Sequence, residues 1–168
     1  MVDDNGQAIR AALNRKALAS ARHRVAAGRL LGLGEREVLA IQYLAAQGSL
    51  TPAQLGERLQ LTSGGTTALV QRLERAGHIE REPHAQDRRS VVLRLTAVAT
   101  REATALFAPL VHELDRLALE VDSEHRAVIR TFIERVADAA ERHADDLVRR
   151  AGSPPPEAVG VPAPGLWA

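Results

Sequence analysis

Apolar residues recur at helical spacing along most of the chain. Ile9, Leu13, Ala17 and Ala21 lie four residues apart, which predicts an amphipathic helix over about residues 7–30. Glycines, prolines and capping residues bound further segments of the same periodicity. These segments predict helices over about residues 35–47, 52–59, 62–76, 97–121 and 123–150. Pro109 interrupts the apolar stripe of one of them and predicts a kink there.

The two short helices in the middle of the chain are separated by a tight turn. Thr51-Pro52-Ala53-Gln54 has the sequence of a capping box with proline at the first helical position, and Thr62-Ser63 can cap the next helix. Such a pair predicts a helix-turn-helix. After Gly77 the period changes to two, and Val91, Leu93 and Leu95 alternate with other residues, which predicts a β-hairpin.

This order of elements predicts the fold class. A helix-turn-helix followed by a two-stranded hairpin is a winged helix, so we expect a mainly α protein with a small β-hairpin wing (α+β) and additional long helices. The expected boundaries are an N-terminal helix at 1–32, the winged helix-turn-helix at 33–96, C-terminal helices at 97–150 and a tail at 151–168. The tail is rich in proline and glycine, which predicts disorder.

Composition excludes several kinds of site. The chain has no cysteine, which rules out disulfides, thiolate metal sites and cysteine nucleophiles. No apolar run approaches the ~18 residues of a spanning helix and no export signal is visible, so we expect a cytoplasmic protein without a membrane partner. The pairs His112 with Asp115 and His125 with Glu124 supply too few ligands for zinc. We expect no metal, no cofactor and no enzymatic activity.

The net charge of +1 conceals a segregated distribution. Residues 1–30 carry six basic and two acidic side chains, and residues 72–101 carry seven and four. Residues 102–150 carry seven basic and eleven acidic side chains. A molecule with this distribution can turn a basic face toward a polyanion.

The helix at 62–76 has side chains suited to double-stranded DNA. The major groove, about 12 Å wide, accepts one helix, and hydroxyls, Gln71 and Arg72 can bond bases or phosphates there. Gly64 and Gly65 either let the helix N-terminus approach a phosphate closely or simply loosen the first turn. At the hairpin tip, Arg88 can enter the minor groove, with Asp87 orienting an arginine; the alternative is a solvated turn. The candidate DNA-binding residues are Thr62, Ser63, Gly64, Thr66, Thr67, Gln71, Arg72, Asp87, Arg88 and Arg89.

One continuous stretch resembles the MarR family of bacterial winged-helix transcription regulators. The resemblance is carried by Leu73-Glu74-Arg75-Ala76-Gly77-His78-Ile79-Glu80-Arg81, by Asp87-Arg88-Arg89-Ser90 and by the Leu95-Thr96 pair that ends the second strand. The upstream run from Leu61 to Thr67 is similar to the family's entry into the recognition helix. His78 stands where the family more often has leucine.

The resemblance implies a homodimer whose N-terminal and C-terminal helices interlock. It also implies a pseudo-palindromic operator, Arg88 in the minor groove, and Ser63, Thr66, Thr67, Gln71 and Arg72 at the major groove or phosphates. We expect a repressor released by a small-molecule effector whose identity the sequence does not give, and the alternative is a regulator that binds DNA without any ligand. Arg15, Arg22 or His23 could meet the carboxylate of an effector or be solvated surface. The alternative hypothesis is a winged-helix protein-interaction module with 151–168 as a docking tail.

Overall fold

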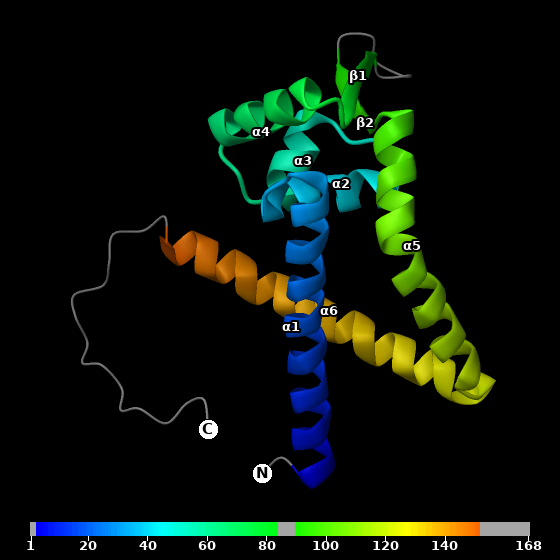
Figure 1. Cartoon of the computed structure of the whole chain (residues 1–168). Coiled ribbons are helices and arrows are strands. Elements are labelled where there is room, and N and C mark those ends of the chain that lie inside the picture. The colour runs from blue at the N-terminus through cyan, green and yellow to red at the C-terminus, as the bar shows by residue number, and fades with distance from the viewer. Residues whose placement is uncertain (1–2, 84–89, 152–168) are drawn as a thin grey trace. The chain divides into compact units, whose positions relative to one another are not determined.

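The computed structural model describes residues 3–83 and 90–151 (Figure 1). The chain order is α1 (Asp4–Leu31), α2 (Glu35–Gln47), α3 (Pro52–Arg58), α4 (Ser63–Arg75), β1 (Ile79–Pro83), β2 (Val91–Leu95), α5 (Ala97–Glu120) and α6 (Ser123–Ala151). The predicted fold class, mainly helical with a small hairpin, is confirmed. Pro109 lies inside α5, which continues to Glu120; a bend in the helix axis at that point stays a prediction.

The first helix begins earlier than its apolar pattern predicts. Asp3 is the N-cap of α1, and its carboxylate accepts a hydrogen bond from Gly6 N at 2.7 Å. The pair Asn5-Gly6 has the composition of a turn, which is why the sequence alone places the start near residue 7. A capping carboxylate compensates for these two weak helix formers.

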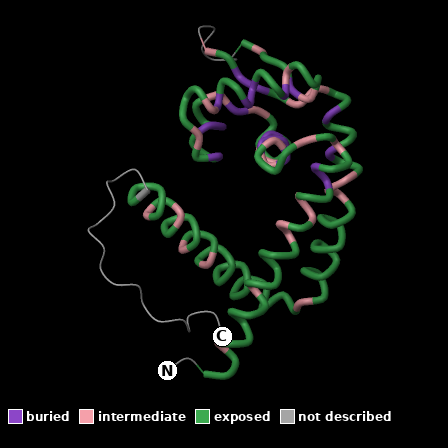
Figure 2. Tube along the Cα trace, turned by 60° about the vertical axis from the view of Figure 1, so that its left-hand side comes forward, coloured by how far each residue is buried: buried purple, intermediate pink, exposed green. Residues whose placement is uncertain are grey.

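The compact core lies where α2, α3, α4 and the hairpin meet. The fully buried side chains there include Ile41, Leu44, Leu55, Leu69, Leu73 and Leu93. Figure 2 shows the buried positions concentrated in this part of the chain and in the adjoining ends of α1 and α5. Each buried leucine contributes about 1.5–3 kcal/mol relative to an exposed one, so the core fixes the orientation of α4.

The two strands pair antiparallel, with Ile79 opposite Leu95 and Arg81 opposite Leu93. Leu93 also exchanges both backbone hydrogen bonds with Leu50, which precedes α3. The predicted alternation along β2 is wrong at its start, because Val91 is 37% exposed while Val92 is only 7% exposed. At Val92 and Leu93 both faces of the strand are covered, so burial does not follow a period of two.

Residues up to Glu113 form one compact unit, and residues from Leu114 belong to a second. In the first unit the His23 ring of α1 packs against Phe107 of α5, with ring centroids 5.6 Å apart. In the second unit α6 presents exposed apolar side chains, among them Val128, Phe132 and Leu147. Across residues 3–83 and 90–151, no helix has the length and apolarity to cross a membrane.

Candidate nucleic-acid interface

The start of α4 is fixed by a threonine cap. Thr62 is the N-cap, and its Oγ1 accepts a hydrogen bond from Gly65 N at 3.2 Å. Thr67 Oγ1 donates to Ser63 O at 2.9 Å within the same first turns. Ser63, Gly64 and Thr67 are exposed, so the structure places three of the predicted site residues together at the exposed N-terminal end of α4.

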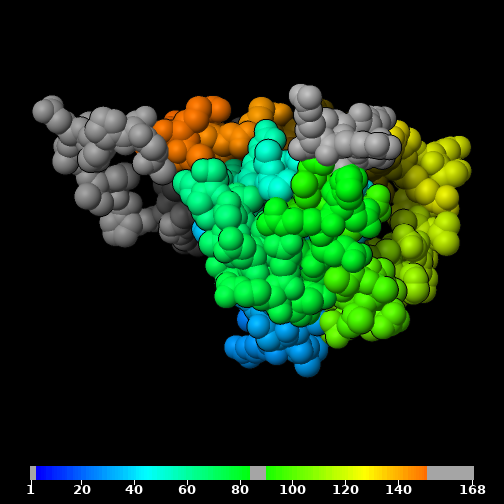
Figure 3. All heavy atoms as spheres, turned by 90° about the horizontal axis from the view of Figure 1, so that it is seen from above, coloured from blue at the N-terminus to red at the C-terminus, as the bar shows by residue number. Residues whose placement is uncertain are grey.

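The face of α4 that points away from the core is polar. Leu69, Val70 and Leu73 are buried on the inner face. The outer face carries exposed residues at helical spacing: Gly64, Thr67, Ala68, Gln71 and Arg75. Figure 3, a view from above, shows the surface to which α4 and the hairpin contribute. This outer face is free of apolar side chains larger than alanine, as expected of a helix that meets a polar partner.

Thr66 does not lie on that outer face, which corrects the prediction that its side chain contacts DNA. Its side chain is 6% exposed, and its Oγ1 donates to Thr62 O at 3.0 Å. It packs against Gly56 of α3. The helical spacing contained the signal, since Thr66 stands three and four residues before the buried Leu69 and Val70.

One flank of α4 is joined to α2. Arg72 Nε donates to Glu37 Oε1 at 2.8 Å, and the Arg72 side chain remains 52% exposed. Glu37 also caps its own helix, because its Oε2 accepts from Gly34 N at 2.7 Å. Arg72 is therefore at the edge of the outer face, available to a partner but already held by a carboxylate.

The opposite flank of α4 is joined to the hairpin. Arg81 of β1 forms a two-point contact with Glu74, with Nε 2.7 Å from Oε1 and Nη2 3.1 Å from Oε2. The hydrogen bond to Glu74 raises the pKa of Arg81 above its ordinary value. Two ion pairs thus hold α4. On one flank α4 supplies the arginine, Arg72, and on the other it supplies the glutamate, Glu74.

The two glycines that open α4 differ in their surroundings. A Cβ on Gly64 would meet no heavy atom of the chain within 4 Å, whereas one on Gly65 would lie 3.3 Å from Thr62 Oγ1. Packing within the described chain therefore gives no reason for glycine at position 64.

The hairpin tip residues Asp87, Arg88 and Arg89 lie outside the described residues. Within the described part of the hairpin, Arg94 of β2 is paired with Glu82 of β1, with Nε and Oε2 2.7 Å apart. At the other end of the hairpin, Thr96 Oγ1 donates to Gly77 O at 2.8 Å and accepts from Ala99 N at 3.2 Å. This hydroxyl joins the end of α4, the hairpin and the start of α5.

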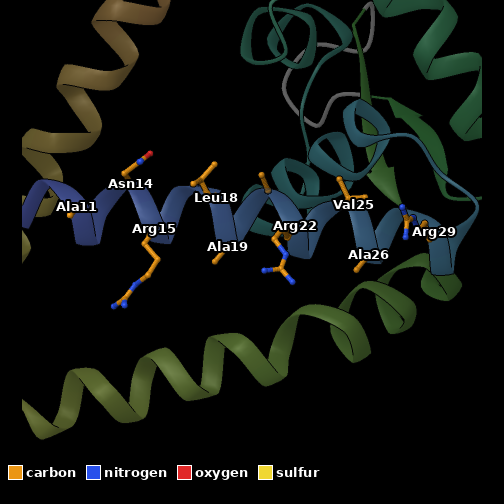
Figure 4. A pocket seen from close by; sticks show the side chains of 10 residues that line it. Ala11, Asn14, Arg15, Leu18, Ala19, Arg22, Val25, Ala26 and Arg29 are labelled. Carbon is orange, nitrogen blue, oxygen red and sulfur yellow. The ribbon is translucent and has the colours of Figure 1, made fainter. Parts of the chain in front are cut away.

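Two of the cavities among the described residues adjoin α1 or α5. One of 420 Å³ lies between α2, β2 and α5, and its lining includes Leu44, Arg94, Thr104 and Phe107. A shallow hollow of 980 Å³ runs along α1, where Figure 4 shows Arg15 and Arg22 extending from the same side of the helix. His23, a candidate effector contact in the sequence, packs against the Phe107 ring instead of lining this hollow. In the described part of the chain, no cluster of three His, Asp or Glu residues could hold a metal ion.

Three residues of this region were missing from the predicted set: Glu37, Arg75 and Arg94. Glu37 and Arg94 form ion pairs with partners that a linear pattern does not pair. Arg75 could have been found from its spacing, because it follows Gln71 by four residues on the exposed stripe. Its Nε donates to Gln71 O at 3.2 Å.

The sequence profile of the MarR family matches residues 31–90, which include α2 to α4 and β1. The HTH-type transcriptional regulator YcgE of Bacillus subtilis is 34% identical over 122 residues, covering 73% of this chain and 79% of YcgE. The chain belongs to the MarR family. As a MarR-family helix-turn-helix transcription regulator it binds DNA, and it is not an enzyme. The predicted membership of this family is confirmed.

Solved structures show the same MarR fold at low sequence identity. A mutant of MepR from a multidrug-resistant S. aureus clinical isolate has a TM-score of 0.60 and 20% identity, over 77% of this chain and 96% of that one. NadR, solved in complex with 4-hydroxyphenylacetate, has a TM-score of 0.58 and 20% identity, over 77% of this chain and 92% of that one.

Proposed function

We propose that this MarR-family regulator is a homodimeric repressor that recognises a pseudo-palindromic operator through the outer face of α4, in the cytoplasm, and responds to a small-molecule effector. The observation that carries the proposal is the polar outer face of α4, clamped at both flanks by the Arg72–Glu37 and Arg81–Glu74 pairs. A helix held in this way can enter a major groove without losing its orientation.

Different residues of the outer face contact phosphates and bases in this proposal. The backbone N–H groups of the first turn, beside Gly64, bind a phosphate, where the positive end of the helix dipole also acts. Gln71, one turn beyond Thr67, offers the paired donor and acceptor that match adenine in the major groove. Arg75 and Arg72 add positive charge for phosphates or guanine. Through the family resemblance, Arg88 of the wing is assigned to the minor groove.

A second copy of the chain is the proposed partner of the long helices. Leu18 of α1, Leu119 of α5 and Val128 of α6 are each more than 60% exposed, and further apolar side chains accompany them on all three helices. Exposed apolar side chains repeated along a helix are typical of an interaction surface. A two-fold dimer would present two α4 helices to half-sites about one helical turn apart, which is why we expect a pseudo-palindrome.

The 420 Å³ cavity between α2, β2 and α5 is the proposed effector site. Its volume suits a small molecule, and its lining is mostly apolar, with Arg94, Thr100 and Thr104 as its polar residues. This lining fits an apolar body that carries a carboxylate. NadR, which shares the fold, was solved with such a molecule, 4-hydroxyphenylacetate.

Selection of bound duplexes from a random pool, at stated salt, tests the DNA proposal. We expect the full-length protein to enrich a pseudo-palindrome and Gln71→Ala to bind it at least about tenfold more weakly. Gln47→Ala, the same change at an exposed position of α2, is the control and should bind like the wild type. Failure of the wild type to enrich any sequence would contradict the proposal and favour the alternative of a protein-interaction module.

A further inference from the structure

Arg72 differs from the other polar residues on the exposed side of α4 because its partner comes from another helix. Glu37 is anchored by Gly34 N at 2.7 Å through Oε2, and it receives Arg72 Nε at 2.8 Å through Oε1. The Glu37 side chain is 15% exposed, so its carboxylate has little freedom. The pair therefore consists of a fixed acceptor and a half-exposed donor.

The carboxylate stays charged at neutral pH. Burial raises the pKa of Glu37, but hydrogen bonds from Arg72 and Gly34, together with the nearby charges of Arg72 and His78, outweigh this and hold the pKa below its ordinary value. A permanent negative charge beside α4 opposes the general attraction of this surface to phosphates.

The contact also restricts what Arg72 can do. A guanidinium has five N–H donors in one plane, and Glu37 takes the donor on Nε. The four remaining donors are those of the terminal nitrogens, and their plane is set by the carboxylate. A flexible arginine side chain loses rotamer entropy when it is ordered. Glu37 imposes part of that ordering before DNA arrives.

We propose that Glu37 is a positioning residue that sets the specificity of DNA binding, by orienting Arg72 at the edge of α4 and by neutralising its charge. Arg72 then contributes to discrimination between sequences more than to nonspecific attraction to phosphates. The inference rests on the proposed role of the outer face of α4. It assigns to a residue of α2 an effect on DNA recognition that requires no contact between that residue and DNA.

Loss of the carboxylate should change specific and nonspecific binding in different ways. In Glu37→Gln the Arg72 guanidinium is released, can follow any phosphate, and displaces an additional counterion. We expect affinity for random DNA to rise and its dependence on salt to steepen by about one in log–log slope. Affinity for the selected operator should change less, so the ratio of specific to nonspecific affinity falls at least about fivefold.

The experiment compares full-length wild type, Glu37→Gln and Glu35→Gln on the selected operator and on a scrambled duplex of equal length, over a salt series. Glu35 is the matched control: it lies in the same first turn of α2, its substitution changes the charge equally, and its partner is Arg24 of α1, 3.6 Å away. The proposal expects a loss of discrimination in Glu37→Gln alone. Equal changes in both variants would show a net-charge effect and overturn it.

A double substitution separates positioning from damage to the fold. If Glu37 acts through Arg72, the variant Glu37→Gln/Arg72→Gln should discriminate no worse than Arg72→Gln alone. Additive losses would overturn the proposal, as would a Glu37→Gln variant that binds with wild-type discrimination and salt slope. A wild type that discriminates between no sequences would instead contradict the proposed function, so the two failures are distinguishable.

Discussion

Gly56 of α3 and Thr66 of α4 are in such close contact that a Cβ on Gly56 would lie 2.4 Å from Thr66 Oγ1. No real Cβ occupies that distance, and Thr66 cannot easily move, because its hydroxyl is bonded to Thr62 O. The turn between the two helices is correspondingly tight, with Leu61 N donating to Gly56 O at 2.9 Å and Gln60 in the left-handed region at φ 52°. The approach of these helices depends on the absence of a side chain at position 56.

Gly56→Ala is therefore predicted to destabilise the protein. Overpacking of a close helix contact costs about 1–3 kcal/mol, which outweighs the gain of about 0.5–1 kcal/mol that alanine brings to a helix interior. Chemical denaturation should give a lower free energy of unfolding. The double variant Gly56→Ala/Thr66→Ala is the control, since removal of the hydroxyl should restore part of the loss; no recovery would show that Thr66 is not the obstacle.

Gly64→Ala is predicted to weaken DNA binding without destabilising the protein. Its Cβ would meet no atom of the chain within 4 Å, so the free energy of unfolding should be unchanged or slightly higher. Affinity for the operator should fall about tenfold, because the methyl group keeps a phosphate from the backbone N–H groups. Denaturation and DNA titration of one preparation measure both. Wild-type DNA affinity would mean that no phosphate approaches the helix there.

Arg81→Gln tests whether the hairpin must be attached to α4. The pair with Glu74 is partly exposed, so its removal should lower stability by no more than about 1 kcal/mol. We expect the loss of DNA-binding free energy to exceed this loss of unfolding free energy, because the hairpin is no longer oriented relative to α4. If affinity falls only as far as stability does, the pair has no orienting role.

Effector binding should depend on Arg94. In the wild type, 4-hydroxyphenylacetate as a probe carboxylate should bind in the 420 Å³ cavity and, by competing with Glu82 for the Arg94 guanidinium, weaken operator binding. Calorimetry with Arg94→Gln should show at least about tenfold weaker probe binding. Arg101→Gln, an exposed arginine of α5, is the control. Equal probe binding by both variants would contradict the assignment.

Stability should decline in acid partly through Glu37. The pKa of its carboxyl is lowered in the folded protein from an ordinary value of 4.5, so the unfolded chain takes up the proton first as pH falls. The contribution of Glu37 to the free energy of unfolding is therefore complete above pH 4.5 and is lost as the pH falls through the lower pKa of the folded protein. Glu37→Gln and Arg72→Gln should each make the acid decline in unfolding free energy shallower. An unchanged decline in both would contradict the assignment.

The sequence was sufficient to predict the secondary-structure elements, which local interactions determine. Capping residues such as Thr51 and Thr62, and apolar periodicity, located the helices and the hairpin of the described residues, because these signals act within a few residues. The contact between Glu37 and Arg72 spans 35 positions in the chain, and no local pattern indicates it. The burial of Thr66 was present in the helical spacing but was outweighed by the expectation that a hydroxyl near a helix start faces DNA.

The proposed reading of DNA bases by the outer face of α4 depends on Gln71, whose amide can pair with adenine. Wild type and Gln71→Ala should be titrated against the selected operator and against all single base-pair variants of one half-site. We expect Gln71→Ala to become indifferent to the base pair at one position, where the wild type loses about 1–3 kcal/mol on substitution, and to keep its preferences elsewhere. A variant that retains the wild-type preference at every position would contradict the claim.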